Sequence, residues 1–404
     1  MTQRFLGLGL ALSVALASAC REVPQAPIAT PPPSALYATV TLDRICPACV
    51  VDTGNLWSGI TLLQPSDQSV HVVALDPLAR RLRYHGCVNA CSDPRNWYTG
   101  TGDTTALLTG FWNWSSAALT VTGIHVVYTI CPDASCIGVR YAYCPGICFH
   151  PANWTDTTLF VGRGTLEAGY GGQSISLAAD SAGGLHLLFS APLAPLPGPA
   201  LRYAHCAAGC ASPANWQDVQ LDAEGGGQTR LIAFDLHSGL HVFSSTSAGL
   251  IHRTCTTNCT SVGSWQSGPM AGGVNAAGLA LAFGADGRLH LVYMNRTGAP
   301  TYATCPAPCG APGSWSTVAL PLRTSDVSLA IARGGTLFLA TTDSTVEVSR
   351  CTADCLVAKS WQTTVVDSAA GGGHVSIAVD SSDHARIVST AGWPNILQYS
   401  QMKN

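Results

Sequence analysis

The chain has 404 residues, of which 11% are charged, and its formal net charge is −3. So few charges leave no broad basic surface, and we therefore do not expect a nucleic-acid partner. The 41 glycines and 24 prolines, together with short β-branched segments, favour an all-β fold in a chain long enough for one large or two ordinary domains.

Residues 1–19 have the pattern of a bacterial export signal peptide. Arg4 is followed by an apolar stretch and then by Ala17-Ser18-Ala19, a small-residue cleavage site. The next residue, Cys20, resembles the lipidated cysteine of bacterial lipoproteins. Lipidation would use one of the 17 cysteines and leave an even number for disulfides. The alternative is ordinary cleavage after Ala19, which yields a soluble secreted protein.

The segment 20–35 is rich in proline and is predicted to be an extended tether. We expect the mature protein in the cell envelope, anchored to the outer membrane because Arg21, and not Asp, follows the cysteine. No later segment is apolar for long enough to cross a bilayer. The predicted membrane contact is therefore the lipid anchor alone, and we expect a monomer.

Residues 36–404 contain seven copies of a repeat whose best preserved part reads S-L-A-x-D-x-x-G-x-L-H-L-V-Y. One copy is GLALAFGADGRLHLVYM, residues 278–294. The copies are 48 to 61 residues apart when the residue at the histidine position serves as a marker. The marker residues are His71, His125, His186, His241, His290, Phe338 and Arg386.

Each repeat contains four short β-rich segments separated by Gly, Asp, Ser and Pro, which is typical of an antiparallel meander. Seven such units predict a seven-bladed β-propeller, in which strands between neighbouring blades are apolar on both faces. The seventh repeat ends in its third strand. Residues 37–42, YATVTL, match the fourth-strand segment WSTVAL at 315–320, so we expect them to complete the seventh blade and close the ring.

Six repeats carry a C-x3-C motif between the third and fourth segments, with a Trp always ten residues after the first Cys. In an exported protein this spacing predicts a disulfide inside each turn, and Cys46/Cys49 and Cys131/Cys136 are predicted to be further loop disulfides. The repeated pairs are Cys87/Cys91, Cys144/Cys148, Cys206/Cys210, Cys255/Cys259, Cys305/Cys309 and Cys351/Cys355. The tryptophans, which we expect to pack between blades, are Trp97, Trp154, Trp216, Trp265, Trp315 and Trp361.

Two other roles are open to the cysteines. A structural zinc site needs four ligands, whereas these pairs lie on separate blades. The segment Cys46-Pro47-Ala48-Cys49 resembles the C-P-x-C motif of thioredoxin-like oxidoreductases, but the βαβ unit of that family is missing here. We therefore expect neither a metal nor another cofactor.

The loops of a propeller divide between two faces. Turns from first to second and from third to fourth strands form one face, here named the cysteine face because it holds the C-x3-C turns. The remaining loops form the variable face, which takes up most of the length variation between repeats, and variable loops on a rigid scaffold often bind ligands. Four tryptophans and two polar residues of these loops are the predicted contact patch, unless the indoles only pin the loops: Trp57, Trp112, Trp114, Trp393, Asn113 and Tyr170.

The recurring histidine is predicted to be structural, packed and hydrogen-bonded to a neighbouring blade. Phe338 at the same position shows that an apolar ring is tolerated there. The alternative is a ring of histidines around the axial channel that binds a metal or an anion.

The repeats resemble those of bacterial sialidase-like and related lectin propellers through the D-x-x-G-x-L-H-L-V-Y pattern. That resemblance implies a glycan-related function, but the Asp-box S-x-D-x-G-x-x-W of sialidases is absent. We predict a non-catalytic binding protein for a glycan or a protein ligand. The alternatives are a glycan-cleaving hydrolase or lyase that uses Glu167 and Glu224, two of the three glutamates after the tether, and a structural envelope scaffold.

Overall fold

A computed structural model of the chain describes most of its repeat region. All of the described residues belong to the compact unit formed by residues 40–404. They are 50–52, 58–64, 69–76, 79–103, 114–130, 138–161, 175–192, 199–222, 230–246, 249–271, 274–295, 299–310, 314–368, 373–391 and 396–402.

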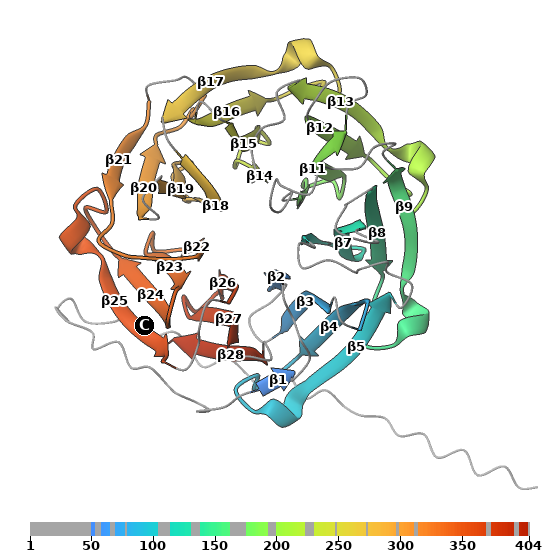
Figure 1. Cartoon of the computed structure of the whole chain (residues 1–404), viewed down its shortest axis with the longest axis horizontal. Coiled ribbons are helices and arrows are strands. Elements are labelled where there is room, and N and C mark those ends of the chain that lie inside the picture. Colours follow the sequence, from blue (N-terminus) through green and yellow to red (C-terminus); the bar gives the residue numbers. More distant parts are fainter. Residues whose placement is uncertain are drawn as a thin grey trace, which may run out of the picture. The chain divides into compact units, whose positions relative to one another are not determined.

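The described residues form seven four-stranded antiparallel sheets arranged in a ring, which confirms the predicted seven-bladed propeller (Figure 1). The first strand of each blade lies nearest the centre of the ring and the fourth lies outermost. Blades 1 to 4 comprise β2 (Ser58–Leu63), β3 (Val70–Asp76), β4 (Arg81–Cys87) and β5 (Trp97–Asp103); β6 (Ser115–Thr120), β7 (Gly123–Ile130), β8 (Gly138–Cys144) and β9 (Thr155–Val161); β10 (Ser176–Ala179), β11 (Leu185–Pro192), β12 (Pro199–Cys206) and β13 (Gln217–Asp222); and β14 (Arg230–Phe234), β15 (Leu240–Thr246), β16 (Gly249–Cys255) and β17 (Gln266–Ala271).

Blades 5 to 7 repeat this order. They comprise β18 (Val274–Phe283), β19 (Leu289–Asn295), β20 (Pro300–Cys305) and β21 (Ser316–Ala319); β22 (Asp326–Ile331), β23 (Leu337–Thr342), β24 (Val346–Cys351) and β25 (Gln362–Asp367); and β26 (Val375–Val379), β27 (Ala385–Ala391), β28 (Ile396–Met402) and β1 (Val50–Asp52).

The outermost strand of blade 7 comes from the N-terminal side of the propeller. β1 pairs antiparallel with β28, and Val50 lies opposite Gln398. The segment 37–42, which we predicted for this place, lies outside the described residues. The strand that the structure describes next to β28 is β1, and the role of residues 37–42 stays a prediction.

Among the described residues, the core consists of seven clusters of buried residues, each of which joins two neighbouring blades. The cluster between blades 7 and 1 contains Val388 and Tyr399 together with Val70 and Val72. Second strands are buried on both faces because a blade covers each side, and every residue of β23 is buried. Interfaces between blades, and not one central core, thus stabilise the ring.

The serine of the repeat pattern hydrogen-bonds to the next blade. Its hydroxyl oxygen accepts the backbone N–H of a residue in the neighbouring first strand, so it ties together the inner strands of two sheets that share no ladder. The four pairs, given as acceptor and donor, are Ser116 and Leu177, Ser176 and Ile232, Ser328 and Ile377, and Ser376 and Leu62.

Each described C-x3-C motif forms a disulfide within its turn, which confirms the pairing predicted for the six repeats that carry it. The bonds are Cys87–Cys91, Cys144–Cys148, Cys206–Cys210, Cys255–Cys259, Cys305–Cys309 and Cys351–Cys355. In blade 1 the backbone carbonyl of Cys91 also accepts the indole N–H of Trp97, at 2.7 Å. The remaining cysteines lie outside the described residues, so the lipid anchor and the two further loop disulfides stay predictions: Cys20, Cys46, Cys49, Cys131 and Cys136.

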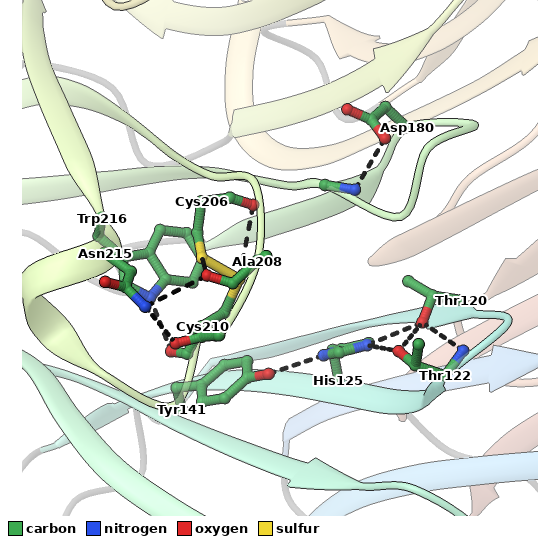
Figure 2. The surroundings of a disulfide bond; sticks show 12 residues. Thr120, Thr122, His125, Tyr141, Asp180, Cys206, Ala208, Cys210, Asn215 and Trp216 are labelled. Carbon is green, nitrogen blue, oxygen red and sulfur yellow. Dashed lines mark hydrogen bonds between the residues drawn. A yellow bond between two sulfur atoms is a disulfide. The ribbon is translucent and has the colours of Figure 1, made fainter.

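The repeat tryptophan is held by the disulfide turn and packs on the preceding blade. In blade 3 the turn continues into the short 3-10 helix η3 (Pro213–Asn215), and the indole N–H of Trp216 donates to the carbonyl of Cys210 at 2.9 Å (Figure 2). The same ring packs against Tyr141 of blade 2, with centroids 6.1 Å apart. The fixed distance from Cys to Trp follows from this geometry.

The helices in the described part of the chain are all short 3-10 helices, and none of them could cross a membrane.

Candidate functional site

The marker histidines hydrogen-bond within their own blades. The Nδ1 atom of His125 lies 2.7 Å from the hydroxyl of Tyr141, which is on the third strand of the same blade (Figure 2). His186 and Tyr203, and His290 and Tyr302, make the same contact at 2.7 Å. These histidines are buried and hydrogen-bonded, as predicted, but the predicted partner is wrong: it belongs to the same blade and not to a neighbouring one, because β pairing places second and third strands side by side.

Burial keeps these imidazoles neutral. Loss of solvent lowers the pKa of His125, His186 and His290 to about 4 from the usual 6.5. At neutral pH these histidines therefore carry no positive charge, and they do not form a cationic ring that would bind an anion in the channel.

The aspartate of the repeat pattern organises the turn between the first and second strands. In blade 4, Asp235 Oδ1 accepts the backbone N–H groups of His237 and Gly239 at 2.8 and 2.6 Å. Its Oδ2 lies 3.3 Å from Nε2 of His241. Burial would raise the pKa of Asp235, but the hydrogen bonds from Gly239, His237 and His241 outweigh it and lower that pKa. The carboxylate is thus charged and held in one orientation.

A cavity of about 400 Å³ opens beside this aspartate on the cysteine face, between blades 4 and 5. We name it the interblade pocket. Blade 4 contributes the β14–β15 turn and Thr256 of its C-x3-C turn. Blade 5 contributes the end of β18 and its own C-x3-C turn. The lining residues are Asp235, His237, Gly239, His241, Thr256, Phe283, Gly287, Ala307, Pro308 and Cys309.

The interblade pocket combines a charged acceptor with an aromatic wall. Phe283 is half-buried and stands edge-on to His241, with ring centroids 5.3 Å apart. The side chain of Asp235 is 23% exposed, and Thr256 is exposed at the rim. A small polar ligand with one apolar face suits such a surface better than a purely apolar ligand does. The pocket lies on the opposite face from Trp114, the described member of the predicted contact patch.

Of that predicted patch, the structure describes Trp114 alone. Trp114 directly precedes β6, which places it at the variable-face end of blade 2, and its ring lies 6.3 Å from the ring of His374, before β26 of blade 7. Its backbone makes two hydrogen bonds with Thr129, and its ring packs on the core between blades 2 and 3. The indole N–H is buried and has no hydrogen-bond partner among the described residues.

The other predicted site residues lie outside the described part of the chain. They are Trp57, Trp112, Asn113, Tyr170 and Trp393, and the alternative acids Glu167 and Glu224.

The interblade pocket could not be predicted from loop-length variation, because its residues come from turns of constant length. A signal was nevertheless present. The three residues between the paired cysteines differ from blade to blade, being TTN in blade 4 and PAP in blade 5, although their number never changes. Variation inside a rigid turn indicates freedom to form different surfaces.

No protein-family model matches this chain, and no curated protein matches it either. Solved structures do resemble it. The BP39L lectin from Burkholderia pseudomallei has a TM-score of 0.59 at 15% identity, covering 86% of this chain and 96% of the lectin. The polysaccharide lyase Uly1 has a TM-score of 0.53 at 10% identity, covering 86% of this chain and 90% of the lyase.

A third solved structure is the SapL1 lectin in complex with alpha methyl fucoside. It has a TM-score of 0.52 at 13% identity and covers 76% of this chain and 95% of the lectin. At these identities the likenesses show a shared propeller fold.

Proposed function

We propose that the protein is a non-catalytic binding protein that recognises a glycan at the interblade pocket. One observation carries the proposal: the charged carboxylate of Asp235 and the ring of Phe283 line the same cavity. A carboxylate accepts hydrogen bonds from pairs of sugar hydroxyls, and an aromatic ring packs against the apolar face of a pyranose. A monosaccharide unit at the end of a glycan is the size of ligand that suits about 400 Å³.

The lining is also preorganised. Disulfides Cys255–Cys259 and Cys305–Cys309 close the two cysteine turns at the rim, and two backbone N–H groups hold Asp235. A rigid site loses less entropy when a ligand binds, which raises the affinity that a few contacts provide.

The similar structures support the same choice of ligand. Two of the three named above are lectins, and one of these holds alpha methyl fucoside. Simple glycosides, with alpha methyl fucoside among them, are therefore the first ligands to test.

The variable face remains a second candidate surface. Trp57, Trp112, Trp114 and Trp393 keep their predicted role there, with Asn113 and Tyr170 as polar contacts. Trp114 is partly exposed at the variable-face end of blade 2, which supports a contact with a glycan or a protein at this face. A Trp114→Ala variant distinguishes the two surfaces. A binding defect in Trp114→Ala that is absent from a pocket variant indicates the variable face, and the reverse indicates the pocket.

The decisive experiment is a glycan-array screen, followed by calorimetric titration of each hit, on the purified exported protein with its disulfides intact. We expect Thr256→Trp, which adds a bulky ring at the exposed rim, and Asp235→Asn to abolish binding. Thr257→Trp is the matched control, since Thr257 is exposed on the same turn but does not line the pocket. Binding that survives both pocket variants but disappears in Trp114→Ala would move the site to the variable face.

An enzymatic alternative has a specific basis in the likeness to a polysaccharide lyase. Glu167 and Glu224 are its candidate acids. Incubation of the protein with each polysaccharide that binds, followed by analysis for shortened products, tests it. Product release that stops in Glu167→Gln would replace the binding proposal with catalysis.

We also infer that the protein acts outside the cytoplasm, with Cys20 lipidated and the mature chain held at the outer membrane. The six disulfides support an oxidising compartment. Labelling of expressing cells with a fatty-acid analogue, and loss of that label in Cys20→Ala, tests the anchor. An unlabelled protein recovered from the medium would favour secretion.

A further inference from the structure

We propose that blade 3 carries a binding site for a divalent transition metal of the Zn²⁺ type, formed by Asp180, His186 and His205 on the cysteine face. One possible ligand atom from each of the three side chains lies within 4.8 Å of the others. His186 on β11 and His205 on β12 are directly opposite each other in the ladder, and their ring centroids are 4.6 Å apart. This site is independent of the proposed glycan site.

The carboxylate is held so that one oxygen is left for the metal. Asp180 Oδ1 accepts the backbone N–H groups of Ala182 and Gly184 at 2.9 and 2.8 Å, and Figure 2 shows Asp180 at this turn. Its Oδ2 points instead to Nε2 of His186, at 3.2 Å. The side chain of Asp180 is 24% exposed, so an ion can reach it from solvent.

His186 has the second partner that metal-binding histidines usually have. Its Nδ1 lies 2.7 Å from the hydroxyl oxygen of Tyr203. When Nε2 binds the metal, Nδ1–H donates to that oxygen and fixes the orientation of the ring. In a tetrahedral Zn²⁺ site, bonds of about 2.1 Å place the ligand atoms about 3.4 Å from one another. The half-buried His205 completes the set by rotating its ring to reach this separation.

Comparison with the other blades shows which ligands of the site belong to the repeated scaffold and which ligand is particular to blade 3. Blade 4 has the same pair, with Asp235 Oδ2 lying 3.3 Å from His241, but Thr254 lies opposite His241 where blade 3 has His205. Opposite the other markers lie Gly86, Tyr143, Thr304, Arg350 and Gln401. The aspartate and histidine pair is thus a recurring turn device, and blade 3 alone adds a third ligand to it at this register.

Two histidines and one carboxylate leave at least one coordination position for water or an external ligand. The ligand types suit Zn²⁺, Co²⁺ or Ni²⁺ and not Ca²⁺, which prefers oxygen ligands alone.

The test is calorimetric titration of the purified exported protein, made without a histidine tag, with Zn²⁺. We expect one ion per chain, and Co²⁺ in its place should give the visible absorption of a low-coordinate site. His205→Thr copies the blade 4 arrangement and should weaken binding at least tenfold. Tyr203→Phe should weaken binding about 10-fold to 100-fold by removing the second partner of His186.

A gain of binding provides the control against misfolding. Thr254→His gives blade 4 its missing third ligand and should raise the stoichiometry to two ions per chain. Thermal unfolding without metal reports whether each variant is folded. Failure of the wild-type protein to bind one equivalent of Zn²⁺, or undiminished binding by folded His205→Thr, would overturn the proposal.

Discussion

The indole ring of Trp154 in blade 2 packs against Tyr84 in blade 1, with ring centroids 6.1 Å apart. Its N–H donates to the carbonyl of Cys148 at 2.7 Å, so one side chain joins the disulfide turn of its own blade to the neighbouring blade. The pairs Trp216 and Tyr141, Trp265 and Tyr203, Trp361 and Tyr302, and Trp97 and Tyr399 repeat the contact around the ring.

Replacement of Trp154 by Ala should destabilise the propeller by about 3–5 kcal/mol, because the ring is buried between two blades. Trp154→Phe should cost less, since it keeps an aromatic ring and loses the hydrogen bond. Denaturant unfolding without reductant measures both. Val121→Ser is the control at a fully exposed position and should leave the midpoint unchanged. Equal stability of Trp154→Ala and wild type would remove the packing role.

The Ser376 hydroxyl, which accepts the N–H of Leu62 at 3.2 Å, links blade 7 to blade 1. Ser376→Ala should lower the free energy of unfolding by about 1–3 kcal/mol, because the Leu62 N–H loses its acceptor. Ser190 provides the matched control, since its buried hydroxyl has no partner within the described residues. Ser190→Ala should be neutral or slightly stabilising, and an equal loss in both variants would speak against the interblade hydrogen bond.

The disulfide Cys351–Cys355 closes a turn of blade 6. Substitution of both cysteines by Ser should lower stability by about 2 kcal/mol, since so small a loop constrains the unfolded chain only modestly. Unfolding curves with and without reductant measure the effect. In the wild type, reductant should lower the midpoint by far more because six such turns are opened together. A midpoint that does not respond to reductant would show that these turns hold without their disulfides.

Acidification should destabilise the fold between pH 6.5 and about 4. The pKa values of His125, His186 and His290 are lowered by burial to about 4, whereas in the unfolded chain they return to 6.5. In that window the unfolded chain binds protons that the folded chain does not, so the free energy of unfolding falls as the pH falls, by up to about 1.4 kcal/mol per pH unit for each histidine.

Denaturant unfolding at several pH values between 7.5 and 4.5 checks this slope. His290→Phe, which places at the marker of blade 5 the residue that blade 6 already has, should reduce it. A slope that is the same in His290→Phe and wild type would mean that other groups control the acid response.

The sequence alone was sufficient to predict the propeller, the number of blades and the six disulfide turns. These features rest on local chemistry repeated at a regular interval: alternating β segments, turn residues, and cysteines four apart. Each copy of the repeat adds evidence for the others. The interblade role of the repeat tryptophans could be predicted for the same reason.

The tertiary structure was needed for everything that depends on which residues lie opposite each other. Register places Tyr143 opposite His125 and Tyr141 two residues along the same strand, where its hydroxyl hydrogen-bonds to His125, and so made the histidine partner a residue of the same blade. The same register brings His205 to His186, while Thr254 faces His241 in blade 4.

The interblade pocket depends on two separate blades. Asp235 and Phe283 meet there only because the ring sets blade 5 against blade 4. Periodicity in a sequence determines what each blade is, since strand and turn preferences act over neighbouring residues. The position of one blade against the next results from packing between residues far apart in the chain, and that packing decided where this protein presents its candidate sites.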